Sequence, residues 1–354
     1  MDTEVPESGN LAPSAPDSRF SELDLALIDA LQTAPRAAWS QVGKALGIDA
    51  TTVARRWDRL RAEGMAWITA YESAKTTTVA FVEVRCRPQA MDAVSAAVTA
   101  LPWVFSVEET AGDYDLLLSV GAPDLPTLGR WTRRDIGALP GLRSTRTRVG
   151  ITLFSEGADW QIRAMGPAQR ATLSTERPSS RTSYSSLSHN RPSAEDQALL
   201  TALGADGRLS YTALGVASGL SEHTARRRVH RMIRDGELLV RCDLAHPLAG
   251  LPTSVSFRMS VPHADLEAAG STLARQANVR LCASVSGPHN LFVQVVLHGL
   301  HGIDAFETLL AERLPTLRVK DRTITLKSAK RLGWLLDEQG RAIGRVPLGP
   351  PQNW

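Results

Sequence analysis

The chain contains one unit written twice, and this internal repeat restricts its fold more than any other feature. Residues 23–64 align without a gap on residues 195–236, a shift of 172 positions (195 − 23), and 14 of these 42 pairs are identical. Unrelated residues of average composition agree at about 6% of positions. A second block, which starts with Gly112 on Gly287, aligns at a shift of 175 positions (287 − 112). Each half therefore consists of a small module followed by a larger one.

The segments outside the two halves are poor in apolar residues. Residues 1–19 are polar and rich in Pro and Ser, and residues 163–192 are dominated by Ser, Thr, Arg, Pro and Gln. Such stretches cannot bury enough surface to offset the entropy lost on ordering. The expected organisation is a disordered tail at 1–19, small modules at 20–72 and 193–245, larger modules at 76–156 and 251–330, a flexible linker at 163–192 and a C-terminal extension at 331–354.

The bulk composition excludes several classes of protein. No apolar run approaches the roughly 20 residues that cross a bilayer, and the first residues lack the apolar core of a secretory signal. We therefore expect a cytoplasmic protein with no membrane partner. The formal net charge of the 354 residues is only +3, so any signal of nucleic-acid binding must be local.

Three cysteines, Cys86, Cys242 and Cys282, are scattered along the chain. Their spacing favours reduced thiols over a metal site or a disulfide. The sequence also has no nucleophile–base pair, no phosphate-binding glycine loop and no metal-ligand spacing. We therefore expect no catalytic residue, no metal and no cofactor.

The small module has the pattern of three short helices. In the first copy, apolar residues recur at helical spacing from Leu23 to Leu31, and Pro35 ends this helix. Ser40 is expected to cap a second helix, which Gly47 ends because glycine accepts a positive φ. This order of helix, tight turn and helix is typical of a helix-turn-helix.

The third helix begins after a capping residue and ends before a glycine. Asp49 in the first copy and Ser221 in the second are good N-cap residues, and the helices run to about Ala62 and Arg234. Short β-prone runs at 65–70 and 237–240 follow, and we interpret them as wings.

The third helix is strongly basic in both copies. The second copy has five arginines and no acid between His223 and Arg234, and arginine forks suit guanine edges and phosphate oxygens. The alternative is a surface helix with a solvated basic face, but arginines at matched positions in both copies favour DNA. The predicted DNA-binding residues are Thr51, Thr52, Arg55, Arg56, Arg59, His223, Thr224, Arg226, Arg227, Arg228 and Arg231.

The larger module has the element order βαββαβ in both copies. This order predicts an α+β, ferredoxin-like fold with two helices on one face of an antiparallel sheet. The other sheet face is partly apolar, which indicates pairing with a second such sheet. The expected elements are 78–85, 89–100, 104–110, 115–120, 125–136 and 143–153 in the first copy, and 253–260, 265–276, 279–285, 290–297, 302–313 and 317–326 in the second.

The chain resembles the Lrp/AsnC (feast/famine) regulators. The resemblance rests on Asp24 to Leu31, Gly47-Ile48, Arg55-Arg56 and Gly112-Asp113-Tyr114-Asp115, and it covers about residues 21–154 and 193–326. It implies a DNA-binding, nucleoid-associated regulator whose βαββαβ (RAM-type) domains dimerise and often assemble further. The tandem duplication departs from the family, whose typical members carry one copy per chain.

The resemblance also implies a small effector, such as an amino acid, bound near the hairpin formed by Gly112, Asp113, Tyr114 and Asp115. The alternative is a hairpin turn built from favourable turn residues. The second copy has Gly287-Pro288-His289-Asn290 instead and lacks the carboxylates. We therefore expect the first copy to keep any effector site and the second to have lost or changed it.

The duplication suggests that one chain mimics the family's homodimer, and that further homo-oligomers form. The expected function is sequence-specific binding of double-stranded DNA in transcription regulation. A competing interpretation is a sirohaem decarboxylase, because proteins of this architecture include such enzymes and the second hairpin, His289 to Phe292, is faintly similar to them. A third is a ligand-sensing protein whose helix-turn-helix no longer binds DNA.

Overall fold

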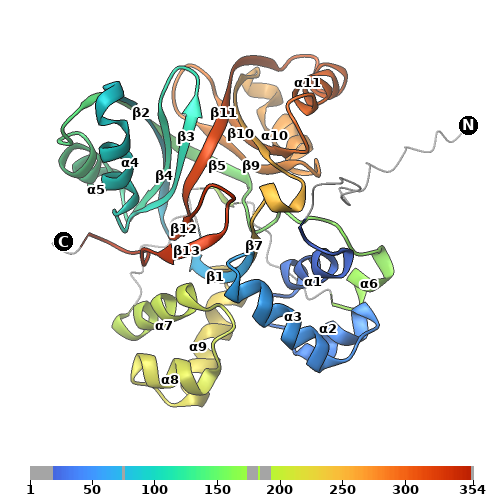
Figure 1. Cartoon of the computed structure of the whole chain (residues 1–354). Coiled ribbons are helices and arrows are strands. Elements are labelled where there is room, and N and C mark those ends of the chain that lie inside the picture. The colour runs from blue at the N-terminus through green and yellow to red at the C-terminus, as the bar shows by residue number, and fades with distance from the viewer. Residues whose placement is uncertain (1–18, 74–75, 174–181, 184–192, 352–354) are drawn as a thin grey trace, which may run out of the picture.

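The computed structural model describes residues 19–73, 76–173, 182–183 and 193–351, and it has two layers (Figure 1). The lower layer holds both helix-turn-helix modules, and the upper layer holds both βαββαβ domains. The expected tail at 1–18 lies outside the described residues. Among the helices described, the longest have 13 residues, and none could span a bilayer.

Both small modules form the three helices that the sequence predicts. Their bounds are α1 (Glu22–Thr33), α2 (Trp39–Leu46) and α3 (Ala50–Ala62) in the first copy, and α7 (Ala194–Ala205), α8 (Tyr211–Ser218) and α9 (Glu222–Arg234) in the second.

The predicted turn and cap residues are confirmed, with one exception. Gly47 ends α2 in the left-handed conformation with a φ of 71°, and the Asp49 carboxylate accepts a hydrogen bond from the Thr52 N–H at 2.8 Å. Ser40 does not cap α2, because the helix starts one residue earlier, at Trp39. The Ala38 N–H instead donates to Gln41 Oε1, so a side chain inside the helix closes its first turn.

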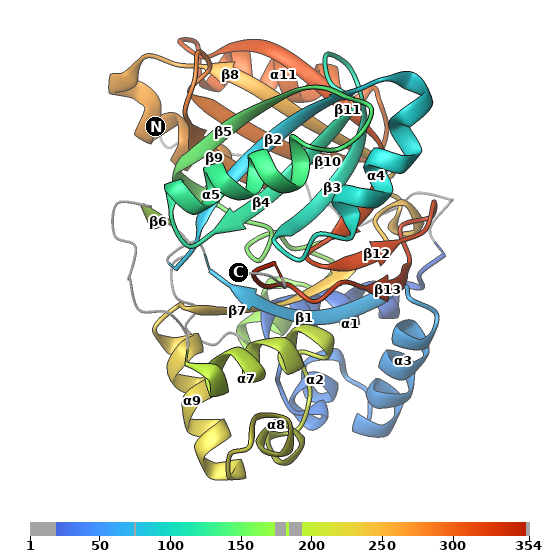
Figure 2. The ribbon, with the colours of Figure 1, turned by 90° about the vertical axis from the view of Figure 1, so that its left-hand side faces the viewer.

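The two runs that were interpreted as wings pair with each other instead. Strand β1 (Ala66–Glu72) lies antiparallel to β7 (Leu238–Leu244), and this ribbon separates the two layers (Figure 2). A lone strand leaves its hydrogen-bonding groups unpaired, and the matching strand of the other half satisfies them. Thr69 pairs with Arg241, its own counterpart at the 172-residue shift (241 − 69). The pseudo-twofold axis that relates the halves therefore passes through this pair.

The two βαββαβ domains share one closed sheet, in the order β11-β3-β4-β2-β5-β9-β10-β8 and back to β11. Within each domain the helices cover the outer face of the sheet (Figure 1). The strands are β2 (Thr78–Cys86), β3 (Val104–Ala111), β4 (Leu116–Ala122), β5 (Leu142–Ser155), β8 (Thr253–Ser260), β9 (Val279–Val285), β10 (Leu291–Leu297) and β11 (Arg318–Arg331). The helices are α4 (Met91–Thr99), α5 (Leu125–Trp131), which continues as a π-helix to Ile136, α10 (Leu266–Ala274) and α11 (Gly302–Arg313).

The domains join through two ladders that the pseudo-twofold axis interchanges. Strand β5 pairs with β9, with Thr152 opposite Ser284, and β11 pairs with β3, with Lys327 opposite Glu109. The second pair is the first one moved by 175 residues (327 − 152, 284 − 109). Pairing of the two domains within one chain is thus confirmed, and it joins sheet edges as well as sheet faces.

Apolar cores lie on both sides of this sheet. One core lies under the outer helices of each domain, and each small module has its own core. A fifth core lies inside the barrel, where the rings of Phe81 and Phe292 are 4.4 Å apart between centroids.

The chain differs from the predicted linker at residues 163–173. This stretch carries α6 (Pro167–Ala171) and buries Met165 and Leu173 in the core of the first module. Arg170 Nη2 lies 2.7 Å from Oδ2 of Asp29, which is fully buried on α1. Few apolar residues suffice here because α1 already presents the surface and the charge that the stretch contacts. Strand β6 (Thr182–Ser183) pairs with β5, and residues 174–181 and 184–192 lie outside the described residues.

The C-terminal extension adds β12 (Trp334–Leu336) and β13 (Ala342–Arg345) beside β11. It also contacts both small modules. The Ala342 N–H donates to the Gly64 carbonyl at 2.8 Å, and Arg345 donates to the Thr201 carbonyl at 3.3 Å. The extension therefore ties the barrel to the layer below.

Candidate nucleic-acid interface

Part of the arginine set on the third helices holds each small module together. On α3, Arg56 and Arg59 contact the two carboxylate oxygens of Asp24 at 3.1 and 2.8 Å. Burial acts to raise the pKa of Asp24, but hydrogen bonds from Arg59 and Ser21 outweigh it and keep that pKa below its usual value. These arginines therefore fasten the third helix to the first.

The second module repeats this arrangement at the matched positions. Arg228 and Arg231 contact the oxygens of Asp196 at 3.0 and 3.2 Å. The identity of these residues in the two copies thus has a structural cause. Whether Arg56, Arg59, Arg228 and Arg231 also contact DNA stays a prediction.

A second set of predicted residues points into solvent. Arg55 and Arg227 are exposed, and neither forms an ion pair within the part of the chain that the structure describes. Thr51 and His223 are exposed at the start of the same helices. Arg226 is also exposed, with its guanidinium 5.0 Å from the centre of the Tyr211 ring and 3.4 Å from Glu222.

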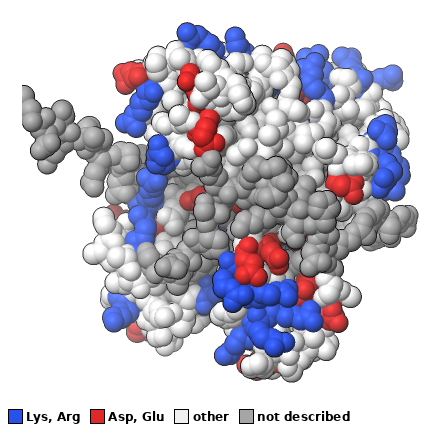
Figure 3. Space-filling model, turned by 180° about the vertical axis from the view of Figure 1, so that it is seen from behind, with Lys and Arg blue, Asp and Glu red and all other residues white. Residues whose placement is uncertain are grey.

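Thr52 and Thr224 take part in helix capping. Thr52 Oγ1 donates to Asp49 at 2.6 Å, and Thr224 Oγ1 accepts from Ser221 at 2.9 Å. Lys and Arg side chains gather over the second module, at the lower right of Figure 3. The guanidinium groups of Arg55 and Arg227, which form no ion pair in the described part of the chain, and this local positive charge suit a phosphate backbone.

The two modules are held side by side by a contact that sequence reasoning missed. Arg208 donates to the carbonyls of Pro35 and Ala37 at 2.7 and 2.8 Å. Arg36 donates in return to the carbonyls of Gly207 and Leu209. We call this contact the arginine clasp. Its signal in the sequence was the identity of Arg36 and Arg208 outside the third helix.

Each arginine of the clasp also stacks on an aromatic ring of the other module. The Arg208 guanidinium lies 3.6 Å from the Trp39 ring centre, and that of Arg36 lies 4.8 Å from the Tyr211 ring centre. Burial and the nearby charge of Arg36 lower the pKa of Arg208 to about 10, so Arg208 stays charged at neutral pH.

The residues of the predicted effector hairpin have partners inside the fold. The Asp115 carboxylate accepts a hydrogen bond from the Cys86 N–H at 2.6 Å. The Tyr114 side chain is buried inside the barrel, where burial raises its pKa to about 12. Gly112 has a φ of 151°, and Asp113 is exposed. An effector role for Gly112, Asp113, Tyr114 and Asp115 stays a prediction.

The second hairpin uses Asn290 in the same structural role. Asn290 Oδ1 accepts from the Val261 N–H at 3.1 Å, and these residues match Asp115 and Cys86 at the 175-residue shift. His289 Nδ1 lies 3.2 Å from Ser260 Oγ. In the described residues, no group of three or more His, Cys, Asp or Glu side chains could hold a metal ion.

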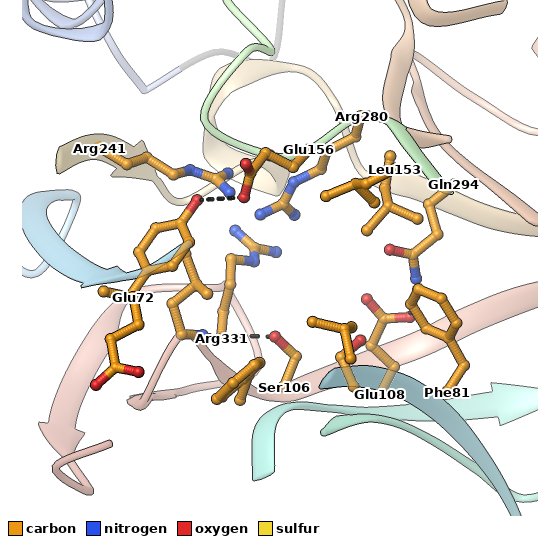
Figure 4. Close-up of a pocket in the computed structure, with 17 residues that line it drawn as sticks. Glu72, Phe81, Ser106, Glu108, Leu153, Glu156, Arg241, Arg280, Gln294 and Arg331 are labelled. Carbon is orange, nitrogen blue, oxygen red and sulfur yellow. Dashed lines mark hydrogen bonds between the residues drawn. The ribbon is translucent and has the colours of Figure 1, made fainter. Parts of the chain in front are cut away.

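A cavity of about 100 Å³ lies inside the barrel, directly beside the β1–β7 ribbon (Figure 4). We call it the axial pocket. Arg241, Arg280 and Arg331 point toward one another at one end of it, around the fully buried Asp243. Sequence reasoning missed these residues because no local motif marks them.

Two family models match segments of the chain, one in the small modules and one in the first of the larger modules. The model of the AsnC-type helix-turn-helix domain matches residues 20–61 and 194–233. The model of the Lrp/AsnC ligand binding domain matches residues 79–156.

Relatives among curated proteins resemble one half of the chain. An uncharacterized HTH-type transcriptional regulator of Pyrococcus abyssi is 29% identical over 140 residues, which are 39% of this chain and 88% of that protein. The HTH-type transcriptional regulator FL11 of Pyrococcus horikoshii is 25% identical over 148 residues, 41% of this chain and 97% of its own length.

Solved structures of one enzyme cover 88% of this chain. The enzyme is the siroheme decarboxylase NirDL, and its complex with an iron-uroporphyrin III analogue has a TM-score of 0.58 over 88% of this chain and 93% of that one. The sequence identity is 13%, so the likeness concerns the fold, which includes both halves in tandem.

Proposed function

Because the chain belongs to the Lrp/AsnC family of DNA-binding transcriptional regulators, in a form that carries the helix-turn-helix twice, we propose that a single chain acts as the family's dimer on DNA. The observation that carries this proposal is the arginine clasp. It fixes α3 and α9 relative to each other, so one chain offers two recognition helices at a set spacing. Protein dimers of this type read two half-sites at a spacing set by their geometry.

The two half-sites should differ in sequence. At matched positions on the third helices, Thr51 corresponds to His223, Ala54 to Arg226 and Asp58 to His230. The symmetry of an operator mirrors the symmetry of the protein. A pseudo-dimer with unlike recognition helices should therefore prefer an asymmetric operator.

Selection from a random DNA library with the full chain, followed by footprinting, tests this proposal. We expect one dominant site with two unlike halves. A perfect palindrome bound by one chain would contradict it. The same experiment on Arg55→Ala and Arg227→Ala assigns each half-site to a module, since each variant should lose selectivity in one half only.

A small effector, such as an amino acid, is part of the proposal through the family's ligand-binding domain. The hairpin of the first copy offers carboxylates that an ammonium group could approach. Asp115 also accepts the Cys86 N–H, so Asp115→Ala would disturb the fold and binding together. Asp115→Asn is the sharper variant, because Asn290 shows that an amide supports the same main-chain hydrogen bond.

Calorimetric titration with the proteinogenic amino acids should therefore show binding to the parent protein and at least ten-fold weaker binding to Asp115→Asn. Equal binding by the parent and Asp115→Asn would show that the hairpin carboxylate is not part of the effector site. Asn290→Asp is the matched variant in the second copy, and it should leave binding by the first copy unchanged.

A second candidate function is the decarboxylation of sirohaem. The observation that favours it is the likeness of the whole tandem fold to a siroheme decarboxylase. The exposed arginines of α3 and α9 have no evident use in such an enzyme, so we propose that the protein is not one. Addition of sirohaem to the purified chain distinguishes the two, because binding shifts the absorption spectrum and decarboxylation releases CO2.

A further inference from the structure

The axial pocket lies on the pseudo-twofold axis, where the two halves meet. Its walls include pairs of residues that match at the 175-residue shift, namely Phe105 and Arg280, Ser106 and Leu281, Ser119 and Gln294, Glu156 and Arg331, and Gly157 and Leu332. Arg241, on the axis itself, lines the pocket from the ribbon. In a dimer of identical subunits both halves of such a pocket would be the same. Here one half has become basic.

Two buried arginines, Arg241 and Arg331, and the half-buried Arg280 share a single buried aspartate at this end. Asp243 lies 3.1 Å from Arg241, 3.4 Å from Arg280 and 3.5 Å from Arg331. The attraction of these guanidinium groups outweighs burial and holds the pKa of Asp243 well below its usual range. The aspartate is therefore charged, and one negative charge faces three positive ones.

The neighbouring Glu156 compensates little of this excess. Glu156 is buried, and burial together with the charge of Asp159 raises its pKa to about 8, so it is mostly neutral at pH 7. Glu108 also has a raised pKa because of burial, and it accepts a hydrogen bond from Gln294 at 2.9 Å. A positive excess inside a protein is costly unless an anion balances it.

The Arg241 guanidinium has an N–H donor that could bind an anion in the pocket. The Arg241 side chain is 4% exposed, and its Nη2 is the atom that lies 3.1 Å from Asp243, whereas its Nε donates no hydrogen bond within the described part of the chain. A Cβ at Gly157 would lie 1.8 Å from Arg241 Nη1, so a larger residue at this position would displace the guanidinium from where it lies. Guanidinium groups carry five N–H donors in a planar fork that matches carboxylate oxygens.

Apolar side chains also line the pocket. Val79, Phe81, Phe105, Leu153 and Leu281 line it. Its volume of about 100 Å³ compares with the roughly 150 Å³ of a cavity that holds benzene. An occupant must therefore be small, with one anionic end and one apolar end.

We propose that the axial pocket binds a small organic carboxylate, with the carboxylate held by Arg241, Arg280 and Arg331 and a short hydrocarbon body against Phe81 and Phe105. A free amino acid fits less well, because its ammonium group would add a positive charge beside the arginines.

The pocket joins the two layers of the molecule. Tyr71 and Arg241 belong to the β1–β7 ribbon, whereas Arg280 and Arg331 belong to the barrel. A carboxylate that contacts both layers favours the conformation in which they are closest together. Its binding is then coupled to the placement of α3 and α9, and by linkage to DNA affinity. This coupling rests on the proposed function, whereas ligand binding itself does not.

Four compounds with one carbon skeleton test the binding. Isothermal titration of the full chain with butanoate and 2-oxobutanoate, which are close to benzene in size, should give saturable binding of at least one anion. The neutral butanamide should bind at least ten-fold more weakly. The zwitterion L-2-aminobutanoate should do so as well in the Asp115→Asn chain, where the hairpin cannot bind it in place of the pocket. Failure of both anions to bind at millimolar concentration would overturn the proposal, and so would equal binding of the amide.

Two variants test whether the anion binds in the axial pocket. Arg280→Gln removes one cation and leaves Asp243 two arginine partners, and we expect at least ten-fold weaker binding of the anion. Ser119→Leu fills the pocket without changing a charge, and it should also weaken binding at least ten-fold. Arg275→Gln, on the exposed end of the same domain's first helix, is the matched control and should bind as the parent does. If Arg280→Gln fails to fold, Ser119→Leu decides alone, and normal binding by Ser119→Leu would overturn the location.

The coupling is measured separately, as DNA affinity with and without the saturating anion. We expect a change of five-fold or more, absent in Ser119→Leu. Anion binding with unchanged DNA affinity would overturn the coupling and leave the pocket in place. Anion binding by a chain that binds no DNA under any condition would instead contradict the proposed function.

Discussion

Arg36 and Arg208 occupy matched positions in the two halves, and each donates hydrogen bonds to main-chain carbonyls beside the other. The contact is self-complementary, as expected at a twofold axis. It ties two modules through groups that carry a full charge, and it uses backbone carbonyls that no substitution removes. The distance between the recognition helices is therefore built into the chain.

Loss of the clasp should loosen the pairing of the modules. Arg208→Ala removes hydrogen bonds from a charged donor that contribute roughly 1.5–3 kcal/mol. We expect weaker binding to the full operator, by ten-fold or more, and little change for a DNA that carries one half-site. Fluorescence anisotropy with both DNAs measures this. An equal loss on both would show that the clasp does not set the spacing.

Neighbouring arginines on α9 should behave differently. Arg227 is exposed, so Arg227→Ala should lower DNA affinity by about 1–3 kcal/mol and leave unfolding in urea unchanged. Arg228 pairs with Asp196 at 3.0 Å, so Arg228→Ala should lower the free energy of unfolding, since it takes one partner from a largely buried carboxylate. If Arg228→Ala kept full stability and lost DNA binding, the structural role of the pair would be wrong.

DNA affinity should depend steeply on salt. Each phosphate contacted contributes about −0.9 to the slope of log affinity against log salt concentration. Removal of Arg55 or Arg227 should reduce the slope by about one unit each, if the contact is to a phosphate. Titrations between low and moderate salt measure this, and an unchanged slope with unchanged base preference would exclude these arginines from the interface.

Stability should fall as pH rises through the neutral range. Burial and Asp159 raise the pKa of Glu156 from 4.5 to about 8. A carboxyl with a raised folded-state pKa favours the fold most below its unfolded value, and this contribution is lost as pH rises toward 8. The slope from this group is at most about 1.4 kcal/mol per pH unit.

Glu156→Gln should therefore flatten the decline in the free energy of unfolding between pH 5 and pH 8, as urea melts would record. Glu338→Gln, on an exposed residue of the C-terminal extension, is the control and should keep the parent's dependence. A parent protein whose stability stays constant over this range would contradict the burial of a neutral Glu156.

Most of the secondary structure could be predicted because each element carries its own local signal. Gly47 must take a positive φ, Asp49 must accept an N-terminal N–H, and strands such as 253–260 show buried residues bounded by turn residues. The predicted wings and the linker at 163–173 were wrong for a shared reason. Their conformation depends on partners far away in the sequence, namely the other half's strand for β1 and Asp29 for Arg170.

The sequence by itself determined that the chain is a doubled unit, which residues form its helices and strands, and which helix is basic. Repetition and periodicity are local properties, so they can be read without coordinates. Only the tertiary structure decided how the arginines are used. It assigned Arg56 and Arg228 to buried carboxylates, Arg36 and Arg208 to the clasp, and Arg241 to the axial pocket. The physical reason is that the charge of an arginine is the same everywhere, while its partners are set by residues that folding brings near.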